Sequence, residues 1–228
     1  MSDIFREVDE DVRRDEALKF WEKYQNYFIV LAAIIALGSG GYRLYDNWRL
    51  GQAQAAGATY QAALTLARDN KGVEAEAALS ELAANSTVGY RTLAALRLAG
   101  ERGKRDPAAG AKAFDQLAAQ SSLDPLLRQL ARIRAAMLVA DTASLADLSA
   151  RVAPLAAAGE PFRHSARELL GLAALKANDL AAAGKWLDQI ATDTEAPAPL
   201  RDRALALLSL VQAGTANAAT EAGAAPAK

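Results

Sequence analysis

Hydrophobic and polar positions follow two different patterns along this chain, and each pattern predicts a different element. Residues 24–42 (YQNYFIVLAAIIALGSGGY) carry no charge over 19 positions. As an α-helix this run would be about 28 Å long, close to the hydrocarbon thickness of a bilayer, which is about 30 Å. Aromatic residues flank the run on both sides, and such rings favour the membrane interface. The first pattern therefore predicts a transmembrane helix over residues 24–45.

The run has two alternative interpretations, a cleaved signal peptide and a buried core helix. A signal peptide has a short basic start and small residues at its cleavage site, whereas this start is long and acidic and the bulky YRLYDNWRL follows. A buried core helix would leave the aromatic flanks without a role. Residues 38–41 (GSGG) lower the helix propensity at one end, but a signal anchor remains the favoured interpretation.

Lysine and arginine residues near the run predict its orientation, because the flank that is richer in them faces the cytoplasm. The residues before the span include Arg6, Arg13, Arg14, Lys19 and Lys23. A similar length after it holds only Arg43 and Arg49. We therefore expect a cytoplasmic N-terminus and, in a bacterium, a single-pass inner-membrane protein whose C-terminal domain is periplasmic.

The second pattern predicts helical hairpins that recur about every 36 residues. Helix-start signals stand at Gly89, Pro125, Pro161 and Pro199, and proline suits the first turn of a helix. A second series predicts the N-caps of the partner helices, because Asn and Asp side chains accept the free backbone N–H groups there. Its members are Asn70, Asp106, Asp141 and Asp179.

Apolar residues at helical spacing predict a buried stripe on the first helix of a hairpin. The stripes are Leu126, Leu130, Ile133 and Met137; Phe162, Ala166, Leu169 and Ala173; and Leu200, Ala204, Leu207 and Val211. Such hairpins must stack to bury these residues, so the predicted fold class is all-α, with one transmembrane helix followed by an α-solenoid. We expect a cytoplasmic amphipathic arm over residues 1–23, the span over 24–45, the solenoid over 46–213 and a disordered tail over 214–228.

Composition excludes several kinds of chemistry. The chain has no cysteine and a single histidine, His164, which argues against disulfides, thiolate catalysis and a typical zinc site. We predict that His164 lies on the surface and that residues 100–105 (GERGKR) form a loop, one that lacks phosphate-loop spacing. The net charge of −1 shows no nucleic-acid footprint. We therefore expect no enzymatic activity, no cofactor, no metal, no nucleic acid and no small-molecule substrate.

Three surfaces are candidates for contacts with partners. Ala32, Ala36 and Gly40 lie four residues apart, a small-residue stripe that lets another membrane helix approach closely. The arm carries apolar residues at positions 4, 8 and 12 bordered by acidic residues, which suits a basic protein partner better than anionic lipid; a helix that lies at the interface is the alternative. The inner side of the solenoid offers aromatic and arginine anchors. Its candidate lining residues are Tyr60, Tyr90, Arg97, Arg128, Arg132 and Arg167.

The fourth hairpin, residues 165–190 (SARELLGLAALKANDLAAAGKWLDQI), resembles a degenerate tetratricopeptide repeat. Its first-helix signature positions are Leu170, Gly171 and Ala174, and its second-helix positions are Ala183 and Leu187. The other hairpins match this repeat more loosely. Trp186 is expected to pack between repeats.

With the arm MSDIFREVDEDVRRDEALKFWEKYQNYF before the span, residues 1 to about 213 resemble the bacterial YfgM-type ancillary subunits of the SecYEG translocon. That resemblance implies one membrane anchor, a periplasmic tetratricopeptide-like domain, and binding to translocon membrane subunits and periplasmic chaperones that assist exported proteins. It brings no catalytic residues. The alternative expectation is a periplasmic tetratricopeptide scaffold for envelope assembly or cell division.

Overall fold

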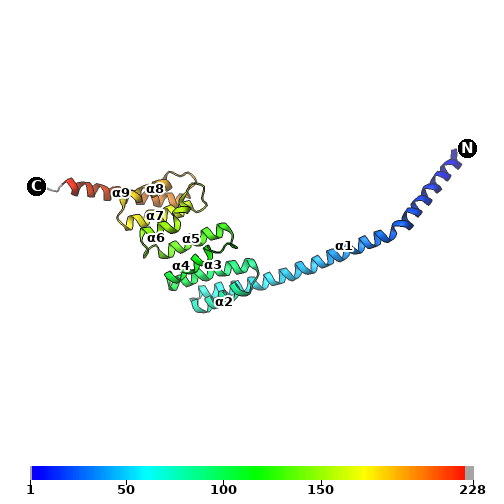
Figure 1. The fold of residues 1–228 in the computed structure, drawn as a ribbon, viewed down its shortest axis with the longest axis horizontal. Coiled ribbons are helices and arrows are strands. Elements are labelled where there is room, and N and C mark those ends of the chain that lie inside the picture. Colours follow the sequence, from blue (N-terminus) through cyan, green and yellow to red (C-terminus); the bar gives the residue numbers. More distant parts are fainter. Residues whose placement is uncertain (1, 224–228) are drawn as a thin grey trace. The chain divides into compact units, whose positions relative to one another are not determined.

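The computed structural model describes the backbone of residues 2–223 and the side chains of Arg14 and residues 18–215. Every regular element in the described range is a helix (Figure 1), so the predicted all-α class is confirmed. The chain divides into two compact units, Met1–Ala55 and Ala56–Lys228. The first unit holds the apolar run and the second holds the helical hairpins.

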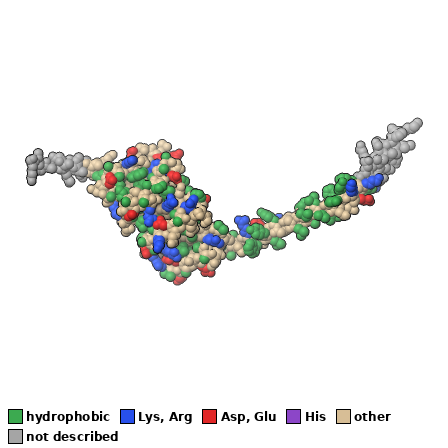
Figure 2. All heavy atoms as spheres, viewed as in Figure 1, with side chains coloured by type: hydrophobic (Ala, Val, Ile, Leu, Met, Phe, Trp, Pro, Cys, Tyr) green, Lys and Arg blue, Asp and Glu red, His purple; other side chains and the backbone are tan. Residues whose placement is uncertain are grey.

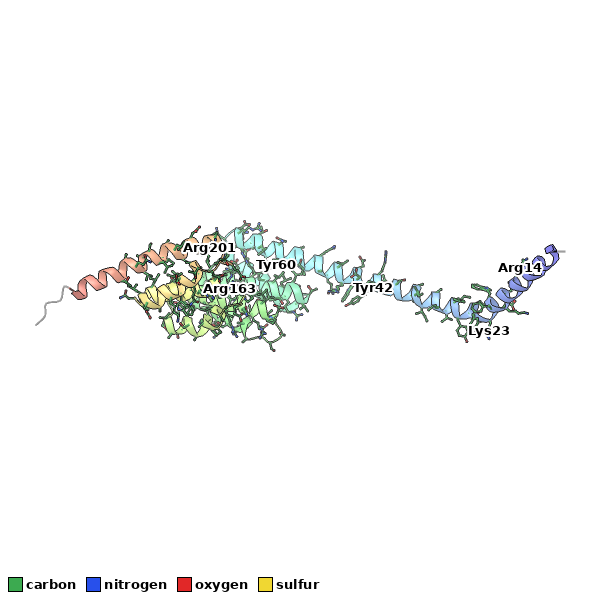
Figure 3. The ribbon with its side chains drawn as sticks, turned by 90° about the horizontal axis from the view of Figure 1, so that it is seen from above. Arg14, Lys23, Tyr42, Tyr60, Arg163 and Arg201 are labelled. Carbon is green, nitrogen blue, oxygen red and sulfur yellow. The ribbon has the colours of Figure 1, made fainter. Side chains whose placement is uncertain are left out.

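Helix α1, Ser2–Arg68, carries the apolar run. Its part from Leu18 to Arg68 is long and apolar enough to span a membrane, and no residue of its most apolar window is buried. Figure 2 shows these apolar side chains uncovered, and Lys23 and Tyr42 mark the two ends of the run in Figure 3. No proline interrupts the segment, so nothing breaks the backbone hydrogen bonding.

The predicted boundaries at residues 23 and 45 both lie inside α1, which continues through them. Helix ends therefore do not mark the arm or the span, and both boundaries stay predictions. The arm prediction rests on Ile4, Val8 and Val12, whose side chains lie outside the described residues.

The second unit is a series of helix pairs that follow one another along the chain (Figure 1). The end of α1 pairs with α2, Gly72–Asn85, and the second pair is α3, Val88–Arg105, and α4, Pro107–Ala118. The third pair is α5, Pro125–Val139, and α6, Leu145–Val152, which the 3-10 turn η1, Ala153–Ala156, follows. The fourth pair is α7, Arg163–Lys176, and α8, Leu180–Ala191, and the last helix is α9, Ala198–Gly223. The buried core of the second unit is divided into clusters along this series of helices. This division is expected of a solenoid, in which each repeat contacts only its neighbours.

The predicted capping pattern is confirmed in part. The Asp106 side chain accepts hydrogen bonds from two backbone N–H groups of α4, both at 3.0 Å, and Asp179 accepts one from α8 at 2.9 Å. The predictions for Asn70 and Asp141 are wrong. Asn70 has a φ of 60°, the left-handed conformation in which asparagine can follow the end of a helix. The side chain that caps α6 is Ser144, not Asp141.

Helix α5 departs from the predicted stripe because it is buried on two sides. Ala131 and Ala135 join a cluster with α3 and α4, while Ile133 joins a cluster with α6 and α7. The small alanines let neighbouring helices approach closely. Leu126 and Met137 are 49% and 45% exposed, so their predicted burial is wrong. The stripes predicted on α7 and α9 are buried or partly buried.

The contact between α3 and α4 depends on two glycines. A Cβ at Gly110 would lie 2.4 Å from the Cα of Gly103, and a Cβ at Gly103 would lie 2.6 Å from the side chain of Leu138. Helices α3 and α4 can approach this closely because Gly110 carries no side chain, and Gly103 leaves room for Leu138 of α5. Residues 100–105 belong to the last turns of α3, so the predicted loop is wrong.

Helix α9 extends into the predicted disordered tail. The predicted tail is residues 214–228, and α9 continues to Gly223, so the disorder of the tail stays a prediction. Alanine, the strongest helix former, is the commonest residue in this stretch. A Cβ at Gly214 would lie 3.0 Å from the side chain of Leu180, so α9 still packs on α8 there. Residues 224–228 lie outside the described residues.

Candidate protein-binding groove

A groove of about 420 Å³ is lined mainly by α3 and α5, with Tyr60 from α1 and Phe114 from α4. Helices α1, α3 and α5 are the first helices of successive pairs. The apolar lining residues of the groove are Leu93, Leu96, Phe114, Leu130, Met137 and Leu138. Its polar lining residues are Tyr60, Arg97, Glu101, Lys104 and Arg134. An apolar surface with a few convergent polar groups is typical of binding sites.

The three helices present equivalent positions to the groove. Tyr60, Arg97 and Arg134 are spaced 37 residues apart, one on each helix. On α3 the lining positions 93, 96, 97, 100, 101 and 104 follow helical spacing, so one face of α3 forms a wall about 16 Å long. Repetition of the hairpin therefore builds the groove.

Glu101 organises the charged wall of the groove. Only 4% of its side chain is exposed, and its carboxylate lies 2.7 Å from the Arg97 guanidinium and 2.8 Å from the Lys104 ammonium. A buried carboxylate needs such compensation. Two cations around one carboxylate leave a single positive charge. Arg134 adds another, because it is exposed and makes no hydrogen bond or ion pair with the described part of the chain.

The structure brings only some of the predicted groove residues together. Tyr60 and Arg97 line the groove, and Tyr90 lies beside Tyr60 with 6.1 Å between ring centroids. Arg132 lines a separate hollow formed by α4, α5 and α6. Arg128 lines neither hollow, and its buried Nε makes no hydrogen bond within the described residues. Whether these side chains bind a partner stays a prediction.

Arg167 belongs to an internal network and not to the groove. Its side chain is buried, and its guanidinium donates to the carbonyl oxygen of Ala156 at 3.0 Å and to that of Gln189 at 3.2 Å. Arg167 therefore ties α7 to η1 and α8. The backbone carbonyls that it binds would otherwise lack a partner at these helix ends.

The same network gathers three cationic or basic side chains around Asp193. One carboxylate oxygen of Asp193 lies 3.1 Å from Arg163 Nε, 2.8 Å from His164 Nε2 and 3.3 Å from Arg167 Nη1; Figure 3 labels Arg163. Hydrogen bonds from Arg163, His164 and the backbone of Glu195 hold the pKa of Asp193 well below its ordinary value. The His164 side chain is only 12% exposed, so the predicted surface histidine is wrong.

The small-residue stripe of the apolar run lies along α1. Ala32, Ala36 and Gly40 are all exposed, helix geometry places them on one face, and a Cβ at Gly40 would have no atom within 4 Å. The nearby Ser39 hydroxyl donates to the carbonyl oxygen of Ala36 at 3.1 Å, which satisfies that polar group within the helix. A partner helix on this face stays a prediction.

The groove residues that sequence reasoning missed include Arg134, Lys104, Leu93 and Met137. Arg134 could have been found, because it stands 37 residues after Arg97. The sequence predicts a loop at Lys104, but this residue lies in α3. The apolar spacing predicts Met137 in the core, but its side chain is exposed. No comparable pattern in the sequence distinguishes Leu93 from a core leucine.

The fourth hairpin has the packing that its repeat signature predicts. Leu170, Ala174, Ala183 and Leu187 have no exposed surface. A Cβ at Gly171 would lie 3.0 Å from the side chain of Leu187, so the glycine lets the two helices of the pair approach closely.

Comparison with known families explains this architecture. The model of the tetratricopeptide repeat-like domain family matches residues 18–198, and the chain belongs to this family. Domains of this kind are typically non-enzymatic scaffolds for protein–protein interaction. No curated protein and no solved structure matches the chain. Among the described residues, no group of three or more His, Cys, Asp or Glu side chains could hold a metal ion.

Proposed function

We propose that this protein is a non-enzymatic, membrane-anchored scaffold that binds the Sec translocon and periplasmic chaperones and so assists exported proteins. It is a single-pass protein of the bacterial inner membrane, with its N-terminus in the cytoplasm and its repeat unit in the periplasm. The observation that carries the proposal is the combination, in one family match over residues 18–198, of an uncovered apolar helix segment and a set of tetratricopeptide-like repeats.

The apolar segment supports anchoring on energetic grounds. Side chains such as Ile34, Ile35 and Leu37 are more than half exposed, and each apolar side chain of this size gains about 1.5–3 kcal/mol on leaving water. A bilayer covers all of them at once. The excess of lysine and arginine before the span supports a cytoplasmic N-terminus.

Anchoring also explains how a modest groove can be useful. A tethered site meets membrane-bound partners at a high effective concentration, on the order of millimolar for short flexible tethers. Weak contacts in the groove and along the Ala32, Ala36 and Gly40 face can then act together. The resemblance of the arm and span to the YfgM-type translocon subunits supports the identity of the partners.

Purification of the tagged full-length protein from its own membranes in mild detergent, followed by mass spectrometry, tests the proposal. Translocon membrane subunits and a periplasmic chaperone should copurify. Their recovery should fall when Ala36→Leu and Gly40→Leu add bulk to the small-residue face. Ile34→Phe adds bulk on the opposite face of the same helix and should leave recovery unchanged.

The identity of the recovered proteins decides the outcome. Recovery of cell-division or envelope-assembly proteins without the translocon would contradict the proposal and favour the alternative scaffold role. If the wild type, the variant with Ala36→Leu and Gly40→Leu, and the Ile34→Phe variant all recovered the translocon equally, the small-residue face would not make the membrane contact.

A further inference from the structure

We propose that the groove between α1, α3 and α5 binds an extended protein segment in which two carboxylates about three residues apart flank apolar side chains. This inference rests on the proposed scaffold function and deepens it, because it names the chemistry of the partner. It is carried by three observations, which are the exposed apolar floor, the net positive charge of the wall and the repeated spacing of the arginines.

The floor of the groove offers apolar surface that the fold itself does not cover. Leu93 and Met137 are 49% and 45% exposed, although Phe114, which lines the same groove, is almost fully buried. The burial of such side chains by a partner is favourable. Apolar anchors that enter a partly formed hollow commonly provide most of the energy of a protein interface.

The charge of the wall selects the partner. Arg97, Lys104 and Arg134 oppose only Glu101, so the groove has a net charge of +2. Because the buried carboxylate holds Arg97 and Lys104 in place, these two cations lose little freedom on binding. The arginine fork matches a carboxylate in two hydrogen bonds. A segment with carboxylates is therefore favoured, and a basic segment is repelled.

The repeat spacing predicts the spacing of those carboxylates. Arg97 and Arg134 occupy equivalent positions on neighbouring first helices, and packed helices lie about 8–10 Å apart. An extended chain of the polyproline II type rises about 3.1 Å per residue with three residues per turn, so side chains three residues apart lie on the same side of it. Two carboxylates about three residues apart can therefore reach both arginines, with the apolar side chains between them directed at the floor.

A fluorescein-labelled 12-residue peptide tests the inference. It carries two glutamates three residues apart, with leucines between and beside them, and its binding to the full-length protein in lipid nanodiscs is followed by fluorescence anisotropy against empty nanodiscs. We expect binding about tenfold tighter than that of the same peptide with lysines in place of the glutamates. The difference should shrink as NaCl rises from about 50 to 500 mM. A peptide with serines in place of leucines should bind weakly.

Charge reversal on α5 provides matched variants of the protein. Arg134→Glu should weaken binding of the glutamate peptide about tenfold and should improve binding of the lysine peptide, a gain that a misfolded variant could not show. Arg132→Glu reverses an exposed charge two residues away that lies outside the groove, and it should change neither affinity more than about twofold. On α3, Leu93→Ser should weaken binding, while Val88→Ser, exposed and outside the groove, should not.

Equal affinity for the glutamate and lysine peptides would overturn the inference, as would equal effects of Arg134→Glu and Arg132→Glu. Either result would leave the proposed scaffold function intact if the translocon still copurified. If the peptides bound as expected but the translocon did not copurify, the inference about the groove would be supported and the proposed partners would be contradicted.

Discussion

The apolar run of the first unit and the core of the second are built from the same residue types in opposite surroundings. Leu37 is 78% exposed, whereas Leu187 has no exposed surface. A Cβ at Gly40 would meet nothing within 4 Å, whereas one at Gly110 would lie 2.4 Å from backbone. Hydrophobicity alone therefore does not define a core. In the run it suits a lipid environment, and in the repeats it must also fit the shape of the neighbouring helices.

The comparison predicts which changes each unit tolerates. Lipid adapts to the size of a side chain but not to a charge, while a packed helix contact responds to every methylene group. Equivalent substitutions in the two units should therefore differ in effect, and two pairs of variants test this difference. Two further pairs compare aspartates within the repeat unit.

The largest difference is expected for leucine truncation. Leu187→Ala should lower the free energy of unfolding of the repeat unit by about 3–5 kcal/mol, because it removes buried surface and leaves a cavity. Leu37→Ala should change it by less than about 0.5 kcal/mol. Urea unfolding of the full-length protein in mild detergent, followed by circular dichroism, measures both. Similar losses of unfolding free energy for the two variants would contradict the difference that we expect between the two units.

Glycine substitution should give the next largest difference. Gly110→Ala should cost about 1–3 kcal/mol, because the added methyl group forces α3 and α4 apart. Gly40→Ala should leave the unfolding of the repeat unit unchanged, since its surroundings are open. Thermal unfolding of both variants provides the measurement. If Gly110→Ala matched the wild type, the close approach at Gly103 could not be essential to the repeats.

Removal of the Asp193 charge should destabilise the last repeat in a pH-dependent way. Since Arg163, His164 and a backbone N–H hold the pKa of Asp193 below its ordinary value, the ionised carboxylate stabilises the fold above the ordinary pKa of about 4. This stabilisation is lost as the pH falls from that value towards the lowered pKa. Asp193→Asn should therefore unfold at a lower temperature than the wild type at pH 7, and the gap should narrow between about pH 5 and pH 3.

The control for this prediction is Asp202→Asn, at an exposed residue without an ion pair among the described residues. It should unfold like the wild type at every pH. A gap between wild type and Asp193→Asn that stayed constant from pH 7 to about pH 3 would contradict the assigned role of the carboxylate.

The smallest difference in stability loss is expected between Asp106 and Asp141, which the sequence pattern predicts equally as N-caps. Asp106→Ala removes the cap of α4 and should cost about 1 kcal/mol. Asp141→Ala should cost less than about 0.5 kcal/mol, because Ser144 provides the cap of α6. Denaturant midpoints distinguish the two. A larger loss for Asp141→Ala would reverse our assignment of the caps.

Features that depend on local spacing could be predicted from the sequence. The fourth hairpin was predicted correctly because Leu170 and Leu187 stand at fixed repeat positions, and Trp186 packs against the neighbouring cluster as expected. The apolar run was recognisable because its length and lack of charge require no knowledge of the fold.

Features that depend on distant partners could not be predicted. His164 is partly buried and contacts Asp193, which lies 29 residues later in the chain. Arg167 points to internal carbonyls that only the fold brings near it. Met137 has the spacing of a core residue, but α5 buries Ala131 and Ala135 on one side and Ile133 on another, and Met137 lies in the groove. The groove was therefore predicted at Tyr60 and Arg97 and missed at Arg134.

The central claim, an anchored scaffold with its repeats outside the cytoplasm, is most directly tested by labelling single cysteines. The chain has no cysteine of its own, so Arg14→Cys and Ser121→Cys each place one thiol at an exposed position. Spheroplasts of a Gram-negative host are treated with a membrane-impermeant maleimide before and after lysis. We predict that the thiol at position 121 is labelled in intact spheroplasts and that the thiol at position 14 is labelled only after lysis. Labelling at position 14 in intact cells, or protection at position 121, would contradict the account.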